Sequence, residues 1–384
     1  MQYKTTVLIA NGIMNAGGTE TLVMEILRHQ TGRVRYILMV HYQGEIQRGI
    51  FDDEIRSLGV EIVYIPSVGS LGINEYCRKF KCIADKIGKI DIIHSHLNAN
   101  SGIICKAAKM AGIPCRISHC HADIRFRGNK ANNLKEEVKL QVLRIFVNKY
   151  SNHYWACSHE AWKRLFYFWK KEVVIPNMID VQEYLSTSKQ KQDAKATIGM
   201  KGKFVVGSVG RVARIKNYEL VLKAIAILSK QGCETHFVCY GRFDAQKDAY
   251  CKELQQLSDS LGITDKVHFK GNTINVTHDI KAFDVFLMPS ITEGFGMAAI
   301  EAQAAGIPTL LSIGIPKIVD VGLGLVKFMP FDPEGWANEI LKIQACSTVQ
   351  DVSHEDIIVA FDKRGYNSAS MVRVIEDKYL EMIH

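Results

Sequence analysis

The sequence predicts an α/β protein with two Rossmann-like, doubly wound domains. Short apolar runs of strand length alternate with amphipathic helical segments along the chain, as in parallel sheets covered by helices. The alternation restarts after a polar stretch at residues 186–197, and 384 residues are too many for one ordinary core. We therefore expect a first domain over residues 1–178, a second over 179–365 and a last helix over 366–384, with an active site in the cleft between the domains.

The first domain is expected to contain seven short strands. Their apolar runs are Thr5–Ala10, Val34–Val40, Ile62–Ile65, Asp91–Ser95, Arg116–His119, Tyr154–Cys157 and Val173–Ile175. Amphipathic helices are expected between them, for instance over Glu20–Arg28 and Ser101–Met110, and Gly112 and Pro114 end the latter.

The second domain repeats the pattern, and its first strands and helices can be placed in order. Expected strands are Phe204–Val209, Thr235–Cys239, Val267–Phe269 and Asp284–Met288, the last of which completes the predicted core. Helices are expected over Tyr218–Ser229, Tyr250–Leu261, Glu334–Ala345 and Ser368–Met382.

The stretch PSITEGFGMAAIEAQAAGIPTLLS after Met288 predicts a ligand-binding turn that runs into a helix. Two carboxylates, Glu293 and Glu301, lie eight positions apart, and Gly294 leaves the backbone between them uncovered. A helix N-terminus binds anions through its free amides, here those of Phe295, Gly296 and Met297. The pattern suits a ligand rich in hydroxyls and phosphates, such as a sugar nucleotide.

Two cations flank the flexible turn that opens the second domain. Arg211 follows Gly210 after the first strand, and Lys216 precedes the next helix, so the pair can neutralise a diphosphate. A solvated surface pair is the ordinary alternative, and the GxxxxGK[ST] phosphate loop is absent. Their place at the mouth of the same sheet as Glu293 favours the functional interpretation.

The first strand is followed by NGIMNAGGTE, in which Gly17 and Gly18 precede a helix that Thr19 could cap. An ordinary strand-to-helix turn is the alternative. Glycines facing a diphosphate would let the backbone approach it closely. The GxGxxG fingerprint is absent, which argues against a dehydrogenase.

Histidines follow two strands, as His94 and His96 in IIHSHLN and as His119 and His121 in RISHCHAD. Residues two apart share a strand face, so a metal site is one interpretation. No carboxylate or cysteine at supporting spacing completes it, and we expect no metal. We favour His121, with Asp123 nearby, as a hydrogen-bonding residue at the reaction centre. His119 is the second candidate for this role and is expected to pack within the strand end.

Charge is unevenly spread, because residues 1–178 carry 25 Lys and Arg against 15 Asp and Glu, a net +10. No nucleic-acid-binding motif is present, so the expected partner of the basic half is an acidic substrate or an anionic membrane surface.

Residues 134–149 are expected to form a basic amphipathic helix that could lie on a membrane. The aromatic residues of 160–171 suit a helix packed on the sheet. Without a transmembrane run, signal peptide or paired cysteines, the expected location is cytoplasmic.

The chain resembles the retaining glycosyltransferases of the GT-B fold, family 4, and most closely the branch that builds bacterial capsular and exopolysaccharides. The matching segments are NAGGTE, DIIHSHLNANSG, RISHCHAD, WACSHEAWKRLF, VIPNMID, GSVGRVARIKNYELVLKAI, VHFKGNT and PSITEGFGMAAIEAQAAGIP. The chain departs from the family pattern at the domain junction, where the family often has Asn-Gly and this chain has Asn177-Met178 before Ile179-Asp180. This departure affects only the geometry expected for that turn.

The resemblance implies a role for each matching residue. Arg211 and Lys216 would bind the donor diphosphate, and Glu301 would hold the ribose hydroxyls. Glu293 and the amides at 295–297 would bind the donor sugar and phosphate. The base would lie near Gly241, Arg242, Asn272 and Thr273. Gly17 and Gly18 would line the diphosphate and acceptor side, and His121 would lie near the transferred sugar. The family needs no metal or other cofactor, and its last helix crosses back onto the first domain.

The expected reaction moves a sugar from a nucleotide diphosphate, uridine first and guanosine second, to a hydroxyl of a glycan or lipid-linked acceptor. No second carboxylate suits a double displacement, so we expect leaving-group-assisted attack on the same face. Two alternatives are a sugar-nucleotide 2-epimerase of similar fold, which needs no acceptor, and a non-catalytic sugar-nucleotide-binding subunit.

Overall fold

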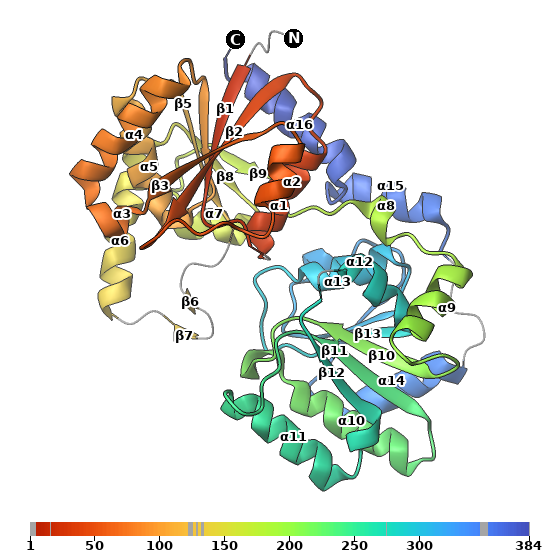
Figure 1. Ribbon diagram of the computed structural model, residues 1–384. Helices are drawn as coiled ribbons and strands as arrows, with labels where there is room; N and C mark the ends of the chain where they lie inside the picture. The colour runs from red at the N-terminus through yellow and green to blue at the C-terminus, as the bar shows by residue number, and fades with distance from the viewer. Residues whose placement is uncertain are drawn as a thin grey trace. The chain divides into compact units, whose positions relative to one another are not determined.

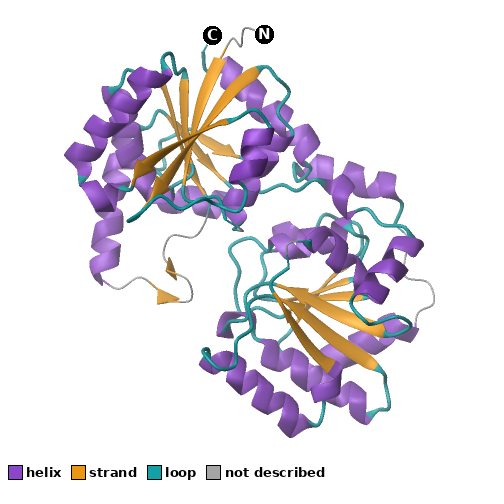
Figure 2. Ribbon diagram, viewed as in Figure 1, coloured by secondary structure: helices purple, strands orange, loops and turns teal. Residues whose placement is uncertain are grey.

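The computed structural model describes residues 5–15, 17–121, 126–127, 130–131, 134–273, 275–345 and 352–383. It divides into two compact units (Figure 1). Unit 1 combines Met1–Ile179 with Gly365–His384, and unit 2 is Asp180–Arg364. Each unit is an α/β sandwich around a parallel sheet (Figure 2), as the sequence predicts.

The sheet of unit 1 has seven parallel strands in the order β3-β2-β1-β4-β5-β8-β9. Along the sequence, β2 and β3 are added on one side of β1, and the strands from β4 onward are added on its other side. The switch point of the strand order therefore lies between β1 and β4. Ligands of such sheets bind beyond the carboxyl ends of the strands at this switch. The strands are β1 (Thr5–Asn11), β2 (Val34–Tyr42), β3 (Glu61–Pro66), β4 (Ile92–Ser95), β5 (Cys115–Cys120), β8 (His153–Ala156) and β9 (Glu172–Val174).

Helices cover both faces of this sheet because its strands are apolar on both faces. Val7 and Ile9 of β1 pack in a core with helices α1 (Gly18–Arg28), α2 (Asp52–Ser57) and α16 (Ser368–Glu381). Leu8 and Ala10 point the other way, into a core with α4 (Ile73–Ile87), α5 (Ser101–Met110) and part of α6 (Leu134–Tyr150). Shorter elements are α3 (Val68–Leu71), η1 (Asn98–Asn100), α7 (His159–Leu165) and a hairpin of β6 (Phe126–Arg127) with β7 (Lys130–Ala131).

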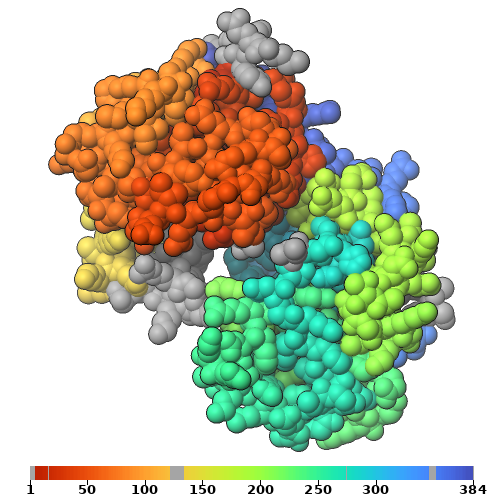
Figure 3. Space-filling view, in the orientation of Figure 1, coloured from red at the N-terminus to blue at the C-terminus, as the bar shows by residue number. Residues whose placement is uncertain are grey.

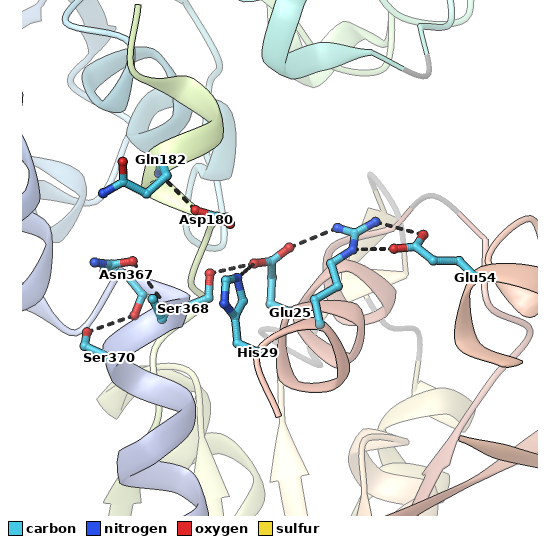
Figure 4. Close-up of polar contacts among 10 residues, drawn as sticks. Glu25, His29, Glu54, Asp180, Gln182, Asn367, Ser368 and Ser370 are labelled. Carbon is cyan, nitrogen blue, oxygen red and sulfur yellow. Dashed lines mark hydrogen bonds and ion pairs between the residues drawn. The ribbon is translucent and has the colours of Figure 1, made fainter. Parts of the chain in front are cut away.

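The C-terminal helix α16 belongs to unit 1 and is fixed there by buried polar contacts. Figure 4 shows Ser368, at the start of α16, donating a hydrogen bond of 2.5 Å to Glu25 of α1. The buried carboxylate of Glu376 accepts hydrogen bonds from the Thr31 amide (3.1 Å) and the Tyr36 hydroxyl (3.2 Å). These contacts join the last segment of the chain to α1 and β2.

The sheet of unit 2 has six parallel strands in the order β12-β11-β10-β13-β14-β15, with its switch between β10 and β13. One face packs on α10 (Tyr218–Lys230), α11 (Ala249–Leu261) and α14 (Pro333–Ala345). The strands are β10 (Phe204–Val209), β11 (Thr235–Tyr240), β12 (Val267–Gly271), β13 (Val285–Met288), β14 (Thr309–Ser312) and β15 (Val326–Met329). The other helices include α8 (Val181–Tyr184), α9 (Ser188–Thr197), α12 (Val276–Asp279), α13 (Met297–Ala304) and α15 (His354–Arg364).

Two sequence predictions about these elements were wrong. The strand ending at Met288 does not complete the core of unit 2, because β14 and β15 extend its sheet. Strand β14 lies within the stretch interpreted as a ligand-binding turn and helix, and Lys327 interrupts the apolar run of β15. The aromatic helix expected over 160–171 ends at Leu165, since Phe166 adopts extended backbone angles. Trp162 and Phe166 are buried as expected, but Phe168 and Trp169 are exposed.

Replacing Tyr379 by Phe tests how α16 is held in unit 1. The Tyr379 hydroxyl lies 2.6 Å from Nδ1 of the buried His94, so Tyr379→Phe leaves that nitrogen without its partner. We expect the free energy of unfolding to fall by about 1–3 kcal/mol in urea denaturation. Tyr167→Phe is the control, because that hydroxyl makes no hydrogen bond to the described residues. Equal stability of the two variants would contradict the prediction.

Candidate functional site

The loops after β10 and β13 meet at the switch point of unit 2. The first contains Arg211 and Lys216, and the second contains Glu293. The backbone amide of Ile291 donates a hydrogen bond of 2.8 Å to the carbonyl of Ile215, which ties the two loops together. Strand order therefore brings together two groups of candidate residues that lie far apart in the sequence.

The charged centre of these loops is an ion pair between Lys216 and Glu293. Lys216 Nζ lies 2.5 Å from Glu293 Oε1, and each side chain is only 17% exposed. Ser290 donates a second hydrogen bond of 2.7 Å to the same carboxylate oxygen. The sequence placed both charges near the site but gave no sign that they contact each other or Ser290.

The turn that follows Glu293 ends in a helix N-terminus with open amides. Gly296, at φ +104°, is the N-cap of α13, and no side chain caps the helix there. This conformation favours glycine. Gly294 is exposed, Phe295 is buried and Met297 begins the helix. The amides of the first turn can bind an anion.

Glu301 lies one turn further along α13 and is partly buried. Burial raises the pKa of its carboxyl to about 7, and a hydrogen bond from Tyr184 opposes that rise. A carboxyl with this pKa changes charge near neutral pH. Tyr184 is on α8, and sequence reasoning missed it because contact between α8 and α13 is a tertiary feature.

Glycines allow the strand ends of β10, β11 and β12 to approach closely. A Cβ on Gly241 would lie 1.8 Å from the carbonyl oxygen of Gly210, and the Gly241 amide donates to Gly271 (2.8 Å). Arg211, which is exposed, and Arg242 line the same pocket of about 290 Å³. Arg211 follows Gly210 and Arg242 follows Gly241, so this contact brings the backbones of the two arginines close together.

Asn272 and Thr273 follow β12 and differ in what they can contribute. Asn272 is exposed. The Thr273 hydroxyl donates to Asp279 (2.6 Å) and accepts from the Asn275 amide (2.9 Å). The Thr273 side chain therefore stabilises this turn, whereas Asn272 is open to a ligand.

In unit 1, Gly17 and Gly18 form the start of α1, after β1. Gly17 is the extended N-cap, and a Cβ there would lie 2.3 Å from a Glu20 carboxylate oxygen. Gly18 is exposed. Thr19 is not the cap, contrary to the sequence prediction, because the helix already begins at Gly18.

His121 follows β5 and is positioned by two partners. Its Nε2 lies 2.9 Å from Nδ1 of His96, and its backbone amide donates to Asn98 Oδ1 (2.8 Å). Burial lowers the pKa of His121 to about 3, so the ring is neutral. Its Nδ1 has no hydrogen-bond partner among the described residues. Asp123, named with His121 in the sequence analysis, lies outside the described residues.

His94 and His119 form a second, fully buried pair behind His121. His94 Nε2 lies 3.0 Å from His119 Nδ1, and burial holds the pKa of both rings well below its usual value. Ligand atoms of His94, His96 and His119 lie within 4.8 Å of one another. Both nitrogens of His94 already have partners, so a metal ion there would have to replace those hydrogen bonds.

A pocket of about 850 Å³ lies at the switch point of unit 1. Gly12 and Ile13 follow β1, and Leu97 follows β4, so the pocket lies at the carboxyl edge of the sheet. Lys139 and Leu143 of α6 also line it. The mixture of apolar walls and a cation suits an amphiphilic ligand with an anionic group.

Comparisons with known proteins point to one activity. Residues 189–351 match the family model described as glycosyl transferases group 1. The chain is 28% identical over 374 residues to a Bacillus subtilis protein named as a glycosyltransferase, EpsF, and the match covers 95% of this chain and 94% of EpsF. It is 25% identical over 345 residues to the UDP-Gal:α-D-GlcNAc-diphosphoundecaprenol α-1,3-galactosyltransferase of Escherichia coli, covering 83% and 85% of the two chains.

Solved structures match the whole fold. HepE of Anabaena, determined in complex with UDP and glucose, superposes with a TM-score of 0.77 and 19% identity over 97% of this chain and 98% of HepE. This likeness shows that the chain has the two-domain GT-B fold. Among the described residues, none of the helices has the length and apolar composition that a membrane span needs.

Replacing Gly241 by Ala tests the close approach of the strand ends. The added methyl group would overlap the Gly210 carbonyl, so the loop that carries Arg211 must move. We expect Gly241→Ala to lower the free energy of unfolding by about 1–3 kcal/mol, measured by thermal and urea denaturation. At Gly294 a Cβ would meet nothing within 4 Å, so Gly294→Ala is the control. A Gly241→Ala protein as stable as Gly294→Ala would count against this packing.

Proposed function

We propose that the chain is a group 1 glycosyltransferase of the GT-B fold that transfers a sugar from a UDP-sugar to a hydroxyl of a glycan or lipid-linked acceptor in polysaccharide biosynthesis. The observation that carries the proposal is the Lys216–Glu293 pair beside the open N-terminus of α13. A cation, a carboxylate and the amides of a helix end without a side-chain cap match the phosphates and hydroxyls of a sugar nucleotide.

Unit 2 is proposed to bind the donor. Arg211 and Lys216 bind the diphosphate, with the amides of Phe295, Gly296 and Met297 at the helix end. Glu293 and Gly294 contact the donor sugar. UDP is the proposed nucleotide because HepE, which shares the fold, was determined with UDP, and the Escherichia coli relative is named for UDP-Gal.

Nucleoside binding is assigned to the residues around the remaining strand ends. Glu301 accepts hydrogen bonds from the ribose hydroxyls, and its partly buried position beside Tyr184 fixes the carboxyl. The base is proposed to lie near Gly241, Arg242 and Asn272. The Thr273 side chain is already hydrogen-bonded to Asp279, so we assign it to shaping that turn.

The chemical step is the breaking of the sugar–phosphate bond, with retained anomeric configuration. Negative charge develops on the leaving diphosphate, and Lys216, Arg211 and the helix-end amides stabilise it. Lys216 then divides its hydrogen bonds between Glu293 and phosphate. Two side-chain cations and a helix end supply this stabilisation, so we propose that no metal ion or other cofactor takes part. The acceptor hydroxyl attacks the anomeric carbon on the same face as the leaving group, the departing phosphate oxygen takes up the hydroxyl proton, and the site aligns the two groups.

Unit 1 is proposed to bind the acceptor, with its 850 Å³ pocket as the site. His121, whose buried Nδ1 has no hydrogen-bond partner among the described residues, is assigned to the vicinity of the transferred sugar, and Gly17 and Gly18 would allow a close approach of backbone to phosphate. The Escherichia coli relative is named for a diphosphoundecaprenol-linked acceptor, which supports a lipid-linked one here. We propose that the enzyme works at the cytoplasmic face of the membrane, in peripheral contact through the basic unit 1.

Thermal-shift measurements with UDP-, GDP- and ADP-sugars, followed by turnover assays, test the proposed function. A UDP-sugar should raise the unfolding temperature most, because a ligand that binds the native state stabilises it. Sugar transfer should then require an acceptor. An epimerised donor formed without acceptor would identify an epimerase, and binding without turnover on any acceptor would identify a non-catalytic subunit.

Replacing Lys216 by Ala is expected to separate catalysis from folding. Loss of the ammonium group removes charge stabilisation from the leaving diphosphate, so turnover should fall about 100-fold or more. The fold should persist, because Ser290 still holds Glu293. Lys223→Ala, at an exposed position on α10, is the matched control. Wild-type turnover by a folded Lys216→Ala protein would exclude Lys216 from the mechanism.

The pKa of Glu301 predicts pH-dependent donor binding. Its carboxyl, with a pKa of about 7 in the free protein, is mostly protonated at pH 6 and mostly ionised at pH 8. If the ionised carboxylate accepts hydrogen bonds from the ribose hydroxyls, donor binding to the protonated form releases a proton. The Kd for UDP-glucose should then fall up to about tenfold as the pH rises from 6 to 8. The diphosphate of UDP-glucose keeps its charge over this range. Calorimetric titration should show that the Kd of Glu301→Gln no longer depends on pH. The same change of Kd with pH in that variant would assign the pH dependence to another group.

A further inference from the structure

Helix α6 is apolar on two faces, and only one of them is covered. Leu140 and Val147 are buried, and Leu143 and Phe146 pack against the core beneath α4 and α5. A second row lies at spacings of four, four and three residues, which places it on one face of the helix. This row is Leu134, Val138, Val142 and Ile145, with exposed fractions of 82%, 57%, 49% and 54%. The simple amphipathic helix expected from sequence therefore has an extra apolar face.

Two exposed aromatic residues lie next to this row. Phe168 is 88% exposed and Trp169 is 62% exposed. The segment just before them is hydrogen-bonded to α6, because the Tyr167 amide donates to Asn148 (3.0 Å) and Asn148 donates to the Leu165 carbonyl (3.2 Å). The aromatic tip is thus fixed beside the last turns of α6. We call the row on α6 together with Phe168 and Trp169 the α6 patch.

Lys and Arg outnumber Glu in the segments that carry the α6 patch, and part of α6 lies on the face shown in Figure 3, where it is yellow. Residues 134–150 and 159–171 together contain eight Lys and Arg against three Glu. Among them, Lys135, Lys139, Lys149, Lys163 and Lys171 are exposed. An apolar stripe with Trp at its end and flanking cations has the chemistry of a surface that inserts into the headgroup region of an anionic bilayer.

We propose that the α6 patch docks unit 1 on an anionic lipid bilayer. Apolar side chains of α6 and the Phe168–Trp169 tip enter the interface, and the flanking lysines contact acidic headgroups. The same helix lines the 850 Å³ pocket with Lys139 and Leu143. Docking on α6 therefore brings that pocket to the membrane surface, where a lipid-linked acceptor is held. The inference rests on the membrane contact of the proposed function, but lipid binding is measured without sugar transfer, so the two can fail separately.

Vesicle sedimentation with the full chain tests the proposal. Wild-type protein should bind vesicles of phosphatidylcholine with phosphatidylglycerol, bind much less to phosphatidylcholine alone, and release in high salt. The variant Val138→Ser/Val142→Ser/Ile145→Ser should bind at least about tenfold more weakly, since three apolar side chains no longer enter the interface. Val359→Ser/Val374→Ser changes exposed apolar residues elsewhere and should bind like wild type. Because all these positions are exposed, thermal unfolding should show that both variants fold.

Tryptophan fluorescence gives a second readout at a defined position. Trp155, Trp162 and Trp336 are buried, so Trp169 dominates the solvent-exposed emission. Anionic vesicles should shift that emission to shorter wavelength, and brominated lipids should quench it. Trp169→Phe should remove the signal but keep most of the binding.

Three outcomes of the lipid experiments would overturn the proposal: no binding of wild type to anionic vesicles, unchanged binding by the α6 triple variant, or no change in Trp169 emission on binding. A wild-type dimer in sedimentation velocity that becomes a monomer in the triple variant would also overturn it. The α6 patch would then be an interface between two copies of the chain.

Discussion

The ion pair between Lys216 and Glu293 is the contact on which the proposed chemistry depends. Its two charges come from loops after neighbouring strands, β10 and β13, and meet at 2.5 Å. The loop that carries Glu293 is itself fixed: the Ser312 hydroxyl donates to the Ser290 carbonyl, and a Cβ on Gly314 would lie 2.0 Å from the Ile291 carbonyl oxygen. A pair held this tightly presents its groups in place before a ligand arrives, as electrostatic catalysis requires.

The pairing also sets the charge that an incoming ligand meets. Glu293 neutralises Lys216 in the free protein, so the attraction for a diphosphate comes first from Arg211, which has no ion-pair partner among the described residues, and from the helix end at Gly296. In the proposed function, phosphate displaces part of the contact between Lys216 and Glu293, and Glu293, still hydrogen-bonded to Ser290, would then accept hydrogen bonds from sugar hydroxyls. One ion pair can thus contact both the diphosphate and the sugar of the donor.

Local sequence signals predicted the elements and many candidate residues, whereas contacts between distant segments could not be predicted. The alternation of strands and helices gave both sheets, and a strand followed by a glycine-bearing turn placed Glu293 and Glu301. The hydrogen bond from Tyr184 to Glu301 and the pairing of His96 with His121 depend on how elements pack, which no local pattern reports. Strands β14 and β15 were missed although they are local elements, because β14 lies within the stretch interpreted as a ligand-binding turn and helix and Lys327 interrupts the apolar run of β15. The sequence predicted that a helix over 134–149 could lie on a membrane, but only the packed structure shows which of its apolar faces stays uncovered.

The two units share one topology, so topology alone does not assign them different roles. Their strand orders correspond from edge to edge over six strands, and each has its switch point beside the first strand. In unit 2, the carboxyl edge carries an ion pair, two arginines and an open helix end, which are groups that recognise phosphate. In unit 1, the same edge carries glycines, neutral imidazoles and a pocket with apolar walls, and exposed lysines gather around α6. The edge chemistry of unit 2 therefore favours a soluble, highly charged donor, and that of unit 1 favours an amphiphilic acceptor delivered at a surface.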